Sequence, residues 1–392
     1  MKNIYLLVGL IKLFIARYVS FFYGKNDNVW LICEKTDEAR DNGYHFFKYC
    51  ILNEKRDDVY YIITKKSYDL EKISFGKENV IYTNSFKHCI YYFRAKKLIT
   101  SQALPFPYSE RLCKFFFKVA NQKYFWLQHG ITKDKLNHKD MDYEYKEYEL
   151  VCCASDREAK FFVDEFGYNE NQAISTGFCR FDSLIDTSSS SDYILVMPTF
   201  RKWLTTSDIV SEPTKMEEDV FLKSDFFKNY SSLFKSEEFS RFLERNNLKV
   251  IFYLHYAFQS YSYLFNKIKN ERVIIAKKGE YDVQKLLRDS KILITDYSSI
   301  FFDFAYMNKP ELFFQFDKNQ YRNQHYGEGY FSYENDAFGP VFSKVDEIID
   351  YLTFLSKRNY LIETKYQNRV DKFFSYRDCK NCERIYKEIS RK

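Results

Sequence analysis

The sequence predicts a two-domain α/β protein in which each domain contains a parallel sheet covered by helices on both faces. Short β-prone runs alternate with helical segments between Val29 and Phe314. The polar segment Asp186–Asp192 interrupts this alternation, which then restarts. A chain of 392 residues is also more typical of two domains, each with its own hydrophobic core, than of one. We therefore expect an N-terminal domain over residues 26–187, a C-terminal domain over residues 188–392 that includes the last helices, and a ligand cleft between the carboxyl ends of two sheets.

The expected elements follow from hydrophobic period and from turn residues at their ends. In the first domain we predict strands at Trp30–Cys33, Val59–Thr64, Val80–Ile81, Lys97–Thr100, Tyr124–Gln128, Leu150–Ala154 and Ala173–Ser175, with helices at Tyr44–Asn53, Ser85–Ala95 and Asp156–Phe166. In the second we predict strands at Tyr193–Met197, Lys249–Leu254, Val273–Ile275, Lys291–Thr295 and Glu311–Phe314, with helices at Phe234–Asn246 and Asp282–Ser290.

Residues 1–25 are predicted to form a separate apolar helix. Lys12 and Arg17 interrupt its apolar run too centrally for a membrane-spanning helix. No small-residue cleavage site follows, which argues against a signal peptide. Two interpretations stay open: a cationic, aromatic-rich helix that lies in a membrane interface, or a helix packed on the protein's own core.

The amino-acid composition favours some classes of protein and excludes others. A chain with 45% hydrophobic and 29% charged residues is globular rather than disordered. The formal net charge of +6 suits an anionic substrate or a membrane surface, and no nucleic-acid motif is present. The nine cysteines are scattered and odd in number, which is typical of reduced intracellular thiols. Cys379 and Cys382 have redox or zinc spacing, but no second pair accompanies them, and we interpret that spacing as accidental.

Residues able to contact an anionic ligand follow several predicted strands, where this architecture places its ligands. His129 and Gly130 follow Tyr124–Gln128, and an imidazole there could act as a general base on a hydroxyl. Thr199 and Arg201 follow the strand at Tyr193–Met197 and suit phosphate oxygens. His255 follows the strand at Lys249–Leu254. We find no cluster at metal-ligand spacing and no GxGxxG or P-loop motif, so we predict no metal and no bound cofactor.

The segment Asp296–Ser299 lies between a predicted strand and a predicted helix. Asp296, Ser298 and Ser299 stand where the first amides of the helix are unpaired, so they could cap the helix in the ordinary way. The same amides and hydroxyls, with the positive end of the helix dipole, also favour a phosphate. Together with the residues after the other strands, they indicate a transferase that uses an activated diphosphate donor.

These motifs, in this order, resemble those of the CDP-glycerol glycerophosphotransferase family of teichoic acid polymerases and their relatives. The resemblance covers about Val29 to the C-terminus and rests on the following segments: Asp41–Phe47, Gln128–Thr132, Thr176–Asp182, Pro198–Arg201, Leu254–Tyr256, Thr295–Phe304 and Pro310–Phe314, with Asp317 and Tyr321-Arg322. Two departures are Gln128, where the family usually has Trp before His-Gly, and Cys379, where its members often have Gly.

The resemblance implies a GT-B fold and transfer of glycerol phosphate from CDP-glycerol to a hydroxyl of a lipid-linked glycan or of a teichoic-acid or capsule-type polymer, with release of CMP. It implies a peripheral location at the cytoplasmic face of the membrane. The implied roles are a base that activates the acceptor (His129), groups that contact the donor phosphates (His255, Ser298 and Ser299), compensation of phosphate charge (Arg201), further binding residues (Gly130, Arg180, Thr199 and Asp296) and support of the helix start (Asp303).

Several alternatives remain open at this point. One is a GT-B glycosyltransferase that uses a nucleotide sugar, and another is a relative that uses CDP-ribitol. A third is a catalytically silent membrane scaffold. The chain is short for a polymerase with an additional targeting domain, so one or few transfers are expected, and an oligomer is compatible with the sequence.

Overall fold

The computed structural model describes residues 2–23, 28–119, 121–136, 141, 144, 147–205, 212–277 and 279–392, with the side chains of 2–6 and 115 left aside. Packing divides these residues into two units. The first contains described residues within 1–131, 137–183 and 375–392, and the second contains residues within 132–136 and 184–374. Each unit is built on one sheet whose strand pairs are all parallel, as the alternating pattern predicts.

The first unit contains a seven-stranded sheet in the order β3-β2-β1-β4-β5-β6-β7. Its strands are β1 (Val29–Cys33), β2 (Val59–Ile63), β3 (Val80–Tyr82), β4 (Ala95–Thr100), β5 (Lys123–Trp126), β6 (Tyr148–Cys153) and β7 (Ala173–Ser175). Its helices are α1 (Lys2–Ser20), η1 (Phe21–Tyr23), α2 (Asn42–Leu52), η2 (Leu70–Asn79), α3 (Phe86–Arg94), α4 (Glu110–Phe116), α7 (Asp156–Phe166), η3 (Cys179–Ser183) and α17 (Asn381–Arg391).

The second unit contains a six-stranded sheet in the order β10-β9-β8-β11-β12-β13. Its strands are β8 (Tyr193–Val196), β9 (Lys249–Tyr253), β10 (Val273–Ala276), β11 (Ile292–Thr295), β12 (Glu311–Phe314) and β13 (Val341–Phe342). Its helices are η4 (Ser188–Ser190), η5 (Lys202–Leu204), α8 (Lys215–Lys223), α9 (Asp225–Lys235), α10 (Glu237–Arg245), η6 (Tyr256–Lys267), α11 (Val283–Asp289), α12 (Ile300–Tyr306), α13 (Lys318–Gln324), α14 (Tyr333–Asp336), α15 (Val345–Ser356) and α16 (Thr364–Phe373). Because β8, β9, β11 and β12 are neighbours, the loops after them meet at one edge.

Two features differ from the sequence-based expectation. The helix expected at Phe234–Asn246 is divided between α9 and α10, because the hydroxyl of Ser236 accepts a hydrogen bond from the Phe239 amide and starts a new helix. Helix α17 belongs to the first unit, although the C-terminal helices were all expected in the second. The Asp182 carboxylate accepts the first amides of α17, and Ile385 is buried in the core of the first unit.

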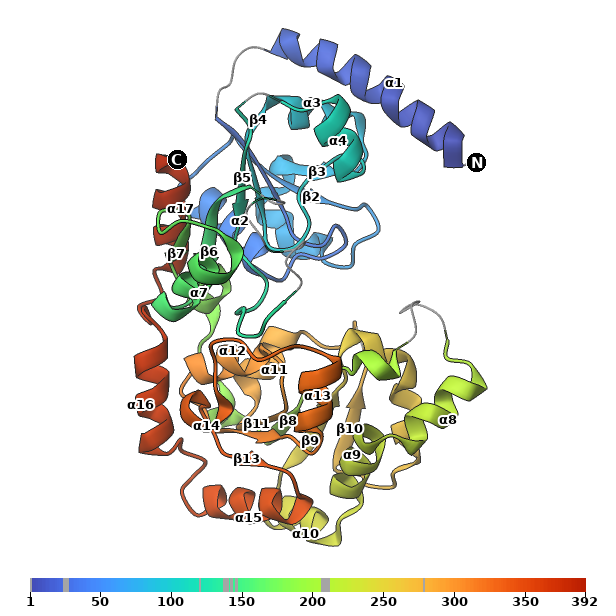
Figure 1. Cartoon of the computed structure of the whole chain (residues 1–392), viewed down its shortest axis with the longest axis vertical. Helices are drawn as coiled ribbons and strands as arrows, with labels where there is room; N and C mark the ends of the chain where they lie inside the picture. Colours follow the sequence, from blue (N-terminus) through green and yellow to red (C-terminus); the bar gives the residue numbers. More distant parts are fainter. Residues whose placement is uncertain are drawn as a thin grey trace. The chain divides into compact units, whose positions relative to one another are not determined.

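Helix α1 lies alongside α3 and α4 in the first unit (Figure 1). Leu13 and Ala16 are buried against these helices. The other side of α1 is strongly apolar and exposed: Phe14 is 71% exposed and Tyr18 is 66% exposed. Thus α1 packs on the protein's core and also presents an apolar face to solvent. None of the described helices is long and apolar enough to cross a bilayer.

Candidate active site

Asp296, at the end of β11, holds two loops of the second unit together. Its Oδ1 accepts a hydrogen bond from the Thr199 amide at 2.8 Å, and its Oδ2 lies 2.9 Å from Nη1 of Arg201. The residue that precedes α12 is Ser299, whose side chain forms no capping bond, while Ser298 Oγ accepts weakly from the Ile300 amide at 3.4 Å. Asp296 is therefore not the helix cap that its position suggests. It connects the loop after β11 to the loop after β8.

Arg201 is enclosed by acidic and aromatic groups. Its Nε lies 2.7 Å from Asp317 Oδ2, its Nη1 donates to the Thr199 carbonyl at 2.7 Å, and the Tyr297 hydroxyl donates to Asp317. Burial alone would lower the pKa of Arg201, but Asp296 and Asp317 raise it above its ordinary value. The guanidinium has no exposed surface. The expected direct contact between Arg201 and phosphate is therefore not supported, since the side chain is committed to positioning the loops.

Thr199, Ser298 and Ser299 are the hydroxyl-bearing residues of this edge. Thr199 is buried, and among the described residues its Oγ1 has no hydrogen-bond partner. Ser298 and Ser299 are half-buried. A buried polar group without a partner is costly in a native protein, so a ligand could account for the Thr199 hydroxyl, and equally for Nε2 of His325, which also has no hydrogen-bond partner among the described residues. Asp303 is buried within α12, where it is not placed to contact a ligand directly.

His255 follows β9 and is half-buried. Its Nδ1 accepts a hydrogen bond from the Ala257 amide at 3.3 Å, so the neutral ring carries its hydrogen on Nε2. The ring stacks on Phe200 with centroids 4.6 Å apart and an interplanar angle of 20°. The aromatic contact orients a hydrogen-bond donor at the edge that also carries Thr199.

His325 is a second histidine of this edge, and the sequence analysis did not select it. Its ring contacts Phe200 at a centroid distance of 4.7 Å, and its Nδ1 accepts from the Lys202 amide at 3.2 Å. Desolvation, followed by Lys202 and Arg201, lowers its pKa to about 3. It follows Tyr321-Arg322 in the chain, but only the fold brings it to Phe200.

His129 follows β5 in the first unit, directly after a residue with an unusual backbone conformation. Gln128 has φ +54, and its buried side-chain amide donates to the Cys152 carbonyl at 2.8 Å and to Glu158 at 3.1 Å. Gly130 is half-buried in the same loop. His129 is exposed. Desolvation by the surrounding protein, followed by the nearby charge of Arg180, lowers its pKa to about 4. Its imidazole is neutral at physiological pH.

Asn42 links the His129 loop to Arg180. The Asn42 amide donates to the Gln128 carbonyl at 2.7 Å, and its Oδ1 accepts from the Arg180 amide at 3.0 Å. The Arg180 guanidinium is nearly buried and lies 3.0 Å from Asp41. Arg180, which was expected to be a binding residue, is thus held beside the His129 loop by Asn42 and Asp41.

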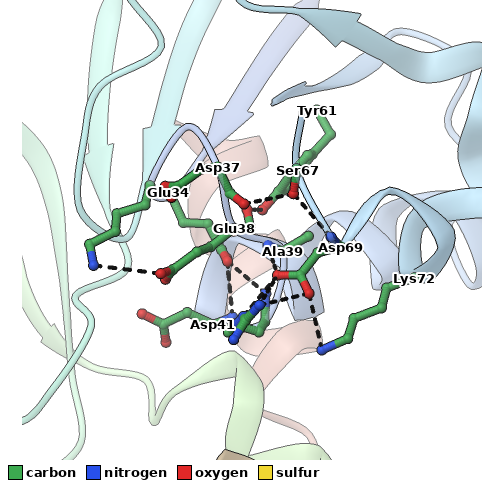
Figure 2. A network of polar contacts seen from close by, with 11 residues as sticks. Glu34, Asp37, Glu38, Ala39, Asp41, Tyr61, Ser67, Asp69 and Lys72 are labelled. Carbon is green, nitrogen blue, oxygen red and sulfur yellow. Dashed lines mark hydrogen bonds and ion pairs between the residues drawn. The ribbon is translucent and has the colours of Figure 1, made fainter. Parts of the chain in front are cut away.

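The loop between β1 and α2 is held by a polar network (Figure 2). The buried Glu34 carboxylate accepts from the Arg40 amide at 2.6 Å and from the Tyr44 amide at 3.0 Å. Asp69 accepts from the Ala39 amide at 2.9 Å and forms an ion pair with Arg40 at 2.7 Å. These bonds fix the start of α2, and with it Asn42.

Comparison with known proteins identifies the family. The family model described as CDP-glycerol:poly(glycerophosphate) glycerophosphotransferase matches residues 14–391. The chain belongs to this family. It is 33% identical over 369 residues to the minor teichoic acid biosynthesis protein GgaB of Bacillus subtilis, covering 92% of this chain and 39% of GgaB. It is 24% identical over 402 residues to the teichoic acid ribitol-phosphate polymerase TarL of Staphylococcus aureus, covering 94% of this chain and 64% of TarL.

The chain thus spans less than two thirds of the length of these two relatives. The fold matches the solved structure of the wall teichoic acid polymerase TagF, with a TM-score of 0.67 and 17% identity over 100% of this chain and 95% of that one. The predicted membership of the family and the predicted fold class, two parallel-sheet α/β domains of the GT-B type, are confirmed.

Proposed function

We propose that the protein transfers glycerol phosphate from CDP-glycerol to a hydroxyl of a lipid-linked glycan or teichoic-acid-type polymer. In this reaction the acceptor oxygen forms a bond to the glycerol-bearing phosphorus, the diphosphate bond breaks, and CMP leaves with the bridging oxygen. The observation that carries the proposal is the family match over residues 14–391, because it includes the described loops that bear His129, Thr199 and His255.

In the second unit, Thr199 Oγ, His255 and the hydroxyls of Ser298 and Ser299 donate hydrogen bonds to the donor phosphates. The buried and unpartnered Thr199 hydroxyl supports this assignment. Arg201 acts indirectly, by holding Asp296 and the Thr199 carbonyl in place. Phosphoryl transfer of this kind depends mainly on positioning and on charge stabilisation.

In the first unit, His129 accepts the proton of the acceptor hydroxyl. Its lowered pKa keeps the imidazole unprotonated when substrate binds, as a general base requires, although it also makes the imidazole a weaker base. Asn42 and Gln128 are positioning residues for its loop.

The decisive experiment measures CMP release from CDP-glycerol on addition of a primer acceptor, with CDP-ribitol and UDP- or GDP-sugars as competing donors. We expect CDP-glycerol to be consumed, and we expect His129→Asn and His255→Asn each to lower kcat/KM at least about a hundredfold without lowering the melting temperature. Turnover of a UDP- or GDP-sugar alone would refute the proposal. CDP-ribitol is the serious competitor, since TarL is named as a ribitol-phosphate polymerase.

We also propose that the exposed face of α1 binds a membrane surface. Leu7, Ile11, Phe14 and Tyr18 are exposed on one helix, with Arg17 exposed on the same helix. Removing α1 would uncover Leu13's core partners, so point substitutions are the cleaner test. Phe14→Asp/Tyr18→Asp should lose flotation with anionic liposomes, whereas Tyr68→Asp, at a residue 97% exposed elsewhere in the first unit, should float normally. Equal flotation of both variants would contradict the assignment.

A further inference from the structure

A polar pocket in the first unit has no part in the proposed chemistry. It has a volume of 390 Å³ and lies between α2, η3 and α17. Small-molecule sites commonly have volumes of about 300–1,000 Å³. The side chains in its lining that could contact a polar ligand include those of His45, Lys48, Asn53, Ser183 and Lys380.

Two lysines and two carboxylates line the pocket. Lys48 and Lys380 are exposed, and neither ammonium forms an ion pair with any residue that the structure describes. The carboxylates already have partners, and the pKa of Glu383 is lowered by its bond to Lys387 and also by the charge of Lys380. Asp182 accepts the Asn381 and Cys382 amides at 2.9 and 2.8 Å, and Glu383 forms an ion pair with Lys387. Lys48 and Lys380 are therefore the cations that an anionic group could contact there, beside two carboxylates that already have partners.

Other hydrogen-bonding groups lie beside these cations. The His45 ring nitrogen Nδ1 lies 3.2 Å from the Ser183 hydroxyl, and the exposed Asn53 amide also lines the pocket. Hydroxyls, amides and imidazoles match the hydroxyls of a polyol, while lysine suits a phosphate as a point charge. The pocket combines both kinds of partner.

The pocket shares its two supporting elements with the His129 loop. Helix α2 carries Asn42, which holds the Gln128 carbonyl, and His45 one turn later. The 3₁₀ helix η3 carries Arg180, which bonds to Asn42, and Ser183 three residues on. If the terminal hydroxyl of an acceptor polymer lies at His129, the next repeat units of that polymer would lie beside α2 and η3.

We infer that this pocket binds a phosphodiester-linked polyol segment of the acceptor, at a repeat unit remote from the reacting hydroxyl. The identity of the acceptor rests on the proposed function, whereas the binding site rests on the pocket itself. Because the cations are exposed, the affinity falls with ionic strength.

The test is binding of a synthetic trimer of phosphodiester-linked glycerol phosphate, measured by titration calorimetry without any donor. Lys48→Ala/Lys380→Ala should weaken binding at least tenfold. The matched control, Lys66→Ala/Lys77→Ala, removes the same charge from exposed positions of the first unit outside the pocket and should change it less than twofold. Equal weakening in both variants, or none in the first, overturns the inference. The inference also fails if inorganic phosphate, at the same concentration as the trimer, displaces the trimer completely. The pocket would then be a simple anion site.

Kinetics separate this inference from the proposed function. With a primer of one unit, Lys48→Ala/Lys380→Ala should release CMP at the wild-type rate. With a primer of several units its KM for acceptor should rise about tenfold while kcat is unchanged. If the wild-type protein binds the trimer through the two lysines but releases no CMP, the proposed function fails and the pocket assignment stands. If CMP release is normal and the KM for the longer primer is unchanged, the pocket assignment fails alone.

Discussion

Nη1 of Arg201 lies 2.9 Å from Oδ2 of Asp296, and both side chains are completely buried. This pair joins the loop after β8 to the loop after β11, and Asp317 extends it to the loop after β12. A buried guanidinium without a counter-charge would be costly, and here Asp296 and Asp317 both lie within ion-pair distance of it. These three side chains therefore form a buried framework that joins the loops carrying Thr199 and the two serines.

Removing this cation should destabilise the second unit. Arg201→Met leaves Asp296 and Asp317 without their counter-charge, and we expect a loss of about 3–5 kcal/mol in the free energy of unfolding. Urea denaturation, with hydrogen exchange of β8 and β11, measures the loss. Arg241→Met, which breaks an exposed pair on α10, should cost less than about 0.5 kcal/mol. Similar losses in the two variants would disprove the framework role.

Asn42→Ala should affect both stability and activity. It leaves the Gln128 carbonyl and the Arg180 amide without their partner, and buried unpaired groups cost about 1–3 kcal/mol each. We expect a loss of about 2–6 kcal/mol in the free energy of unfolding and a reduced kcat, because Gln128 precedes His129. The exposed Asn171→Ala is the control and should match the wild type in both measurements. A normal kcat in Asn42→Ala would argue against its positioning role.

Two glycines with the same φ separate backbone strain from steric conflict. Gly177 and Gly167 both have φ +75, but a Cβ on Gly177 would lie 1.9 Å from Oδ1 of Asn381, whereas a Cβ on Gly167 would meet nothing within 4 Å. Gly167→Ala should cost about 1–2 kcal/mol from conformation alone. Gly177→Ala should cost clearly more and should increase proteolysis at α17. Equal melting temperatures of the two variants would contradict this.

His88 should make the stability of the first unit depend on pH. Desolvation lowers its pKa to about 4, from 6.5 in the unfolded chain. Between these values the unfolded state binds a proton that the folded state does not. The contribution of His88 to the free energy of unfolding should therefore be fully present above about pH 6.5. It should fall by up to about 3 kcal/mol as the pH is lowered towards 4. His88→Gln keeps a donor for the Pro105 carbonyl, and its stability should vary less with pH. An identical pH profile would exclude His88 as the cause.

If His129 is the general base, the acid side of the pH–rate profile should lie at an unusually low pH. If it is the base, kcat/KM for the acceptor should stay flat between about pH 5.5 and 7.5 and decline only as pH approaches the lowered pKa of about 4. The pH–rate profile is the measurement. A limb near the ordinary histidine value would assign the titration to another group.

Much of the fold was predictable because the hydrophobic pattern of single segments is consistent with the parallel α/β architecture. Short, β-prone apolar runs such as Ile292–Thr295 and Tyr193–Val196 indicate buried strands, and their alternation with helices favours parallel sheets. The break at Ser236 was less visible, since Phe234 and Phe239 continue a plausible helical stripe on both sides of the cap. The return of α17 to the first unit depends on Asp182, almost two hundred residues earlier in the chain, and no local pattern reports such a bond.

The sequence by itself determined the family, the two α/β units and the loops that carry His129, Thr199, His255 and Ser298, because motif order and strand period are local properties of the chain. The tertiary structure alone decided what each side chain can do. It buried Arg201 between two carboxylates, brought His325 to Phe200, and left the Thr199 hydroxyl without a partner. Burial and pairing depend on groups distant in the chain, and they decide whether a charged residue binds a ligand or supports the residues that do.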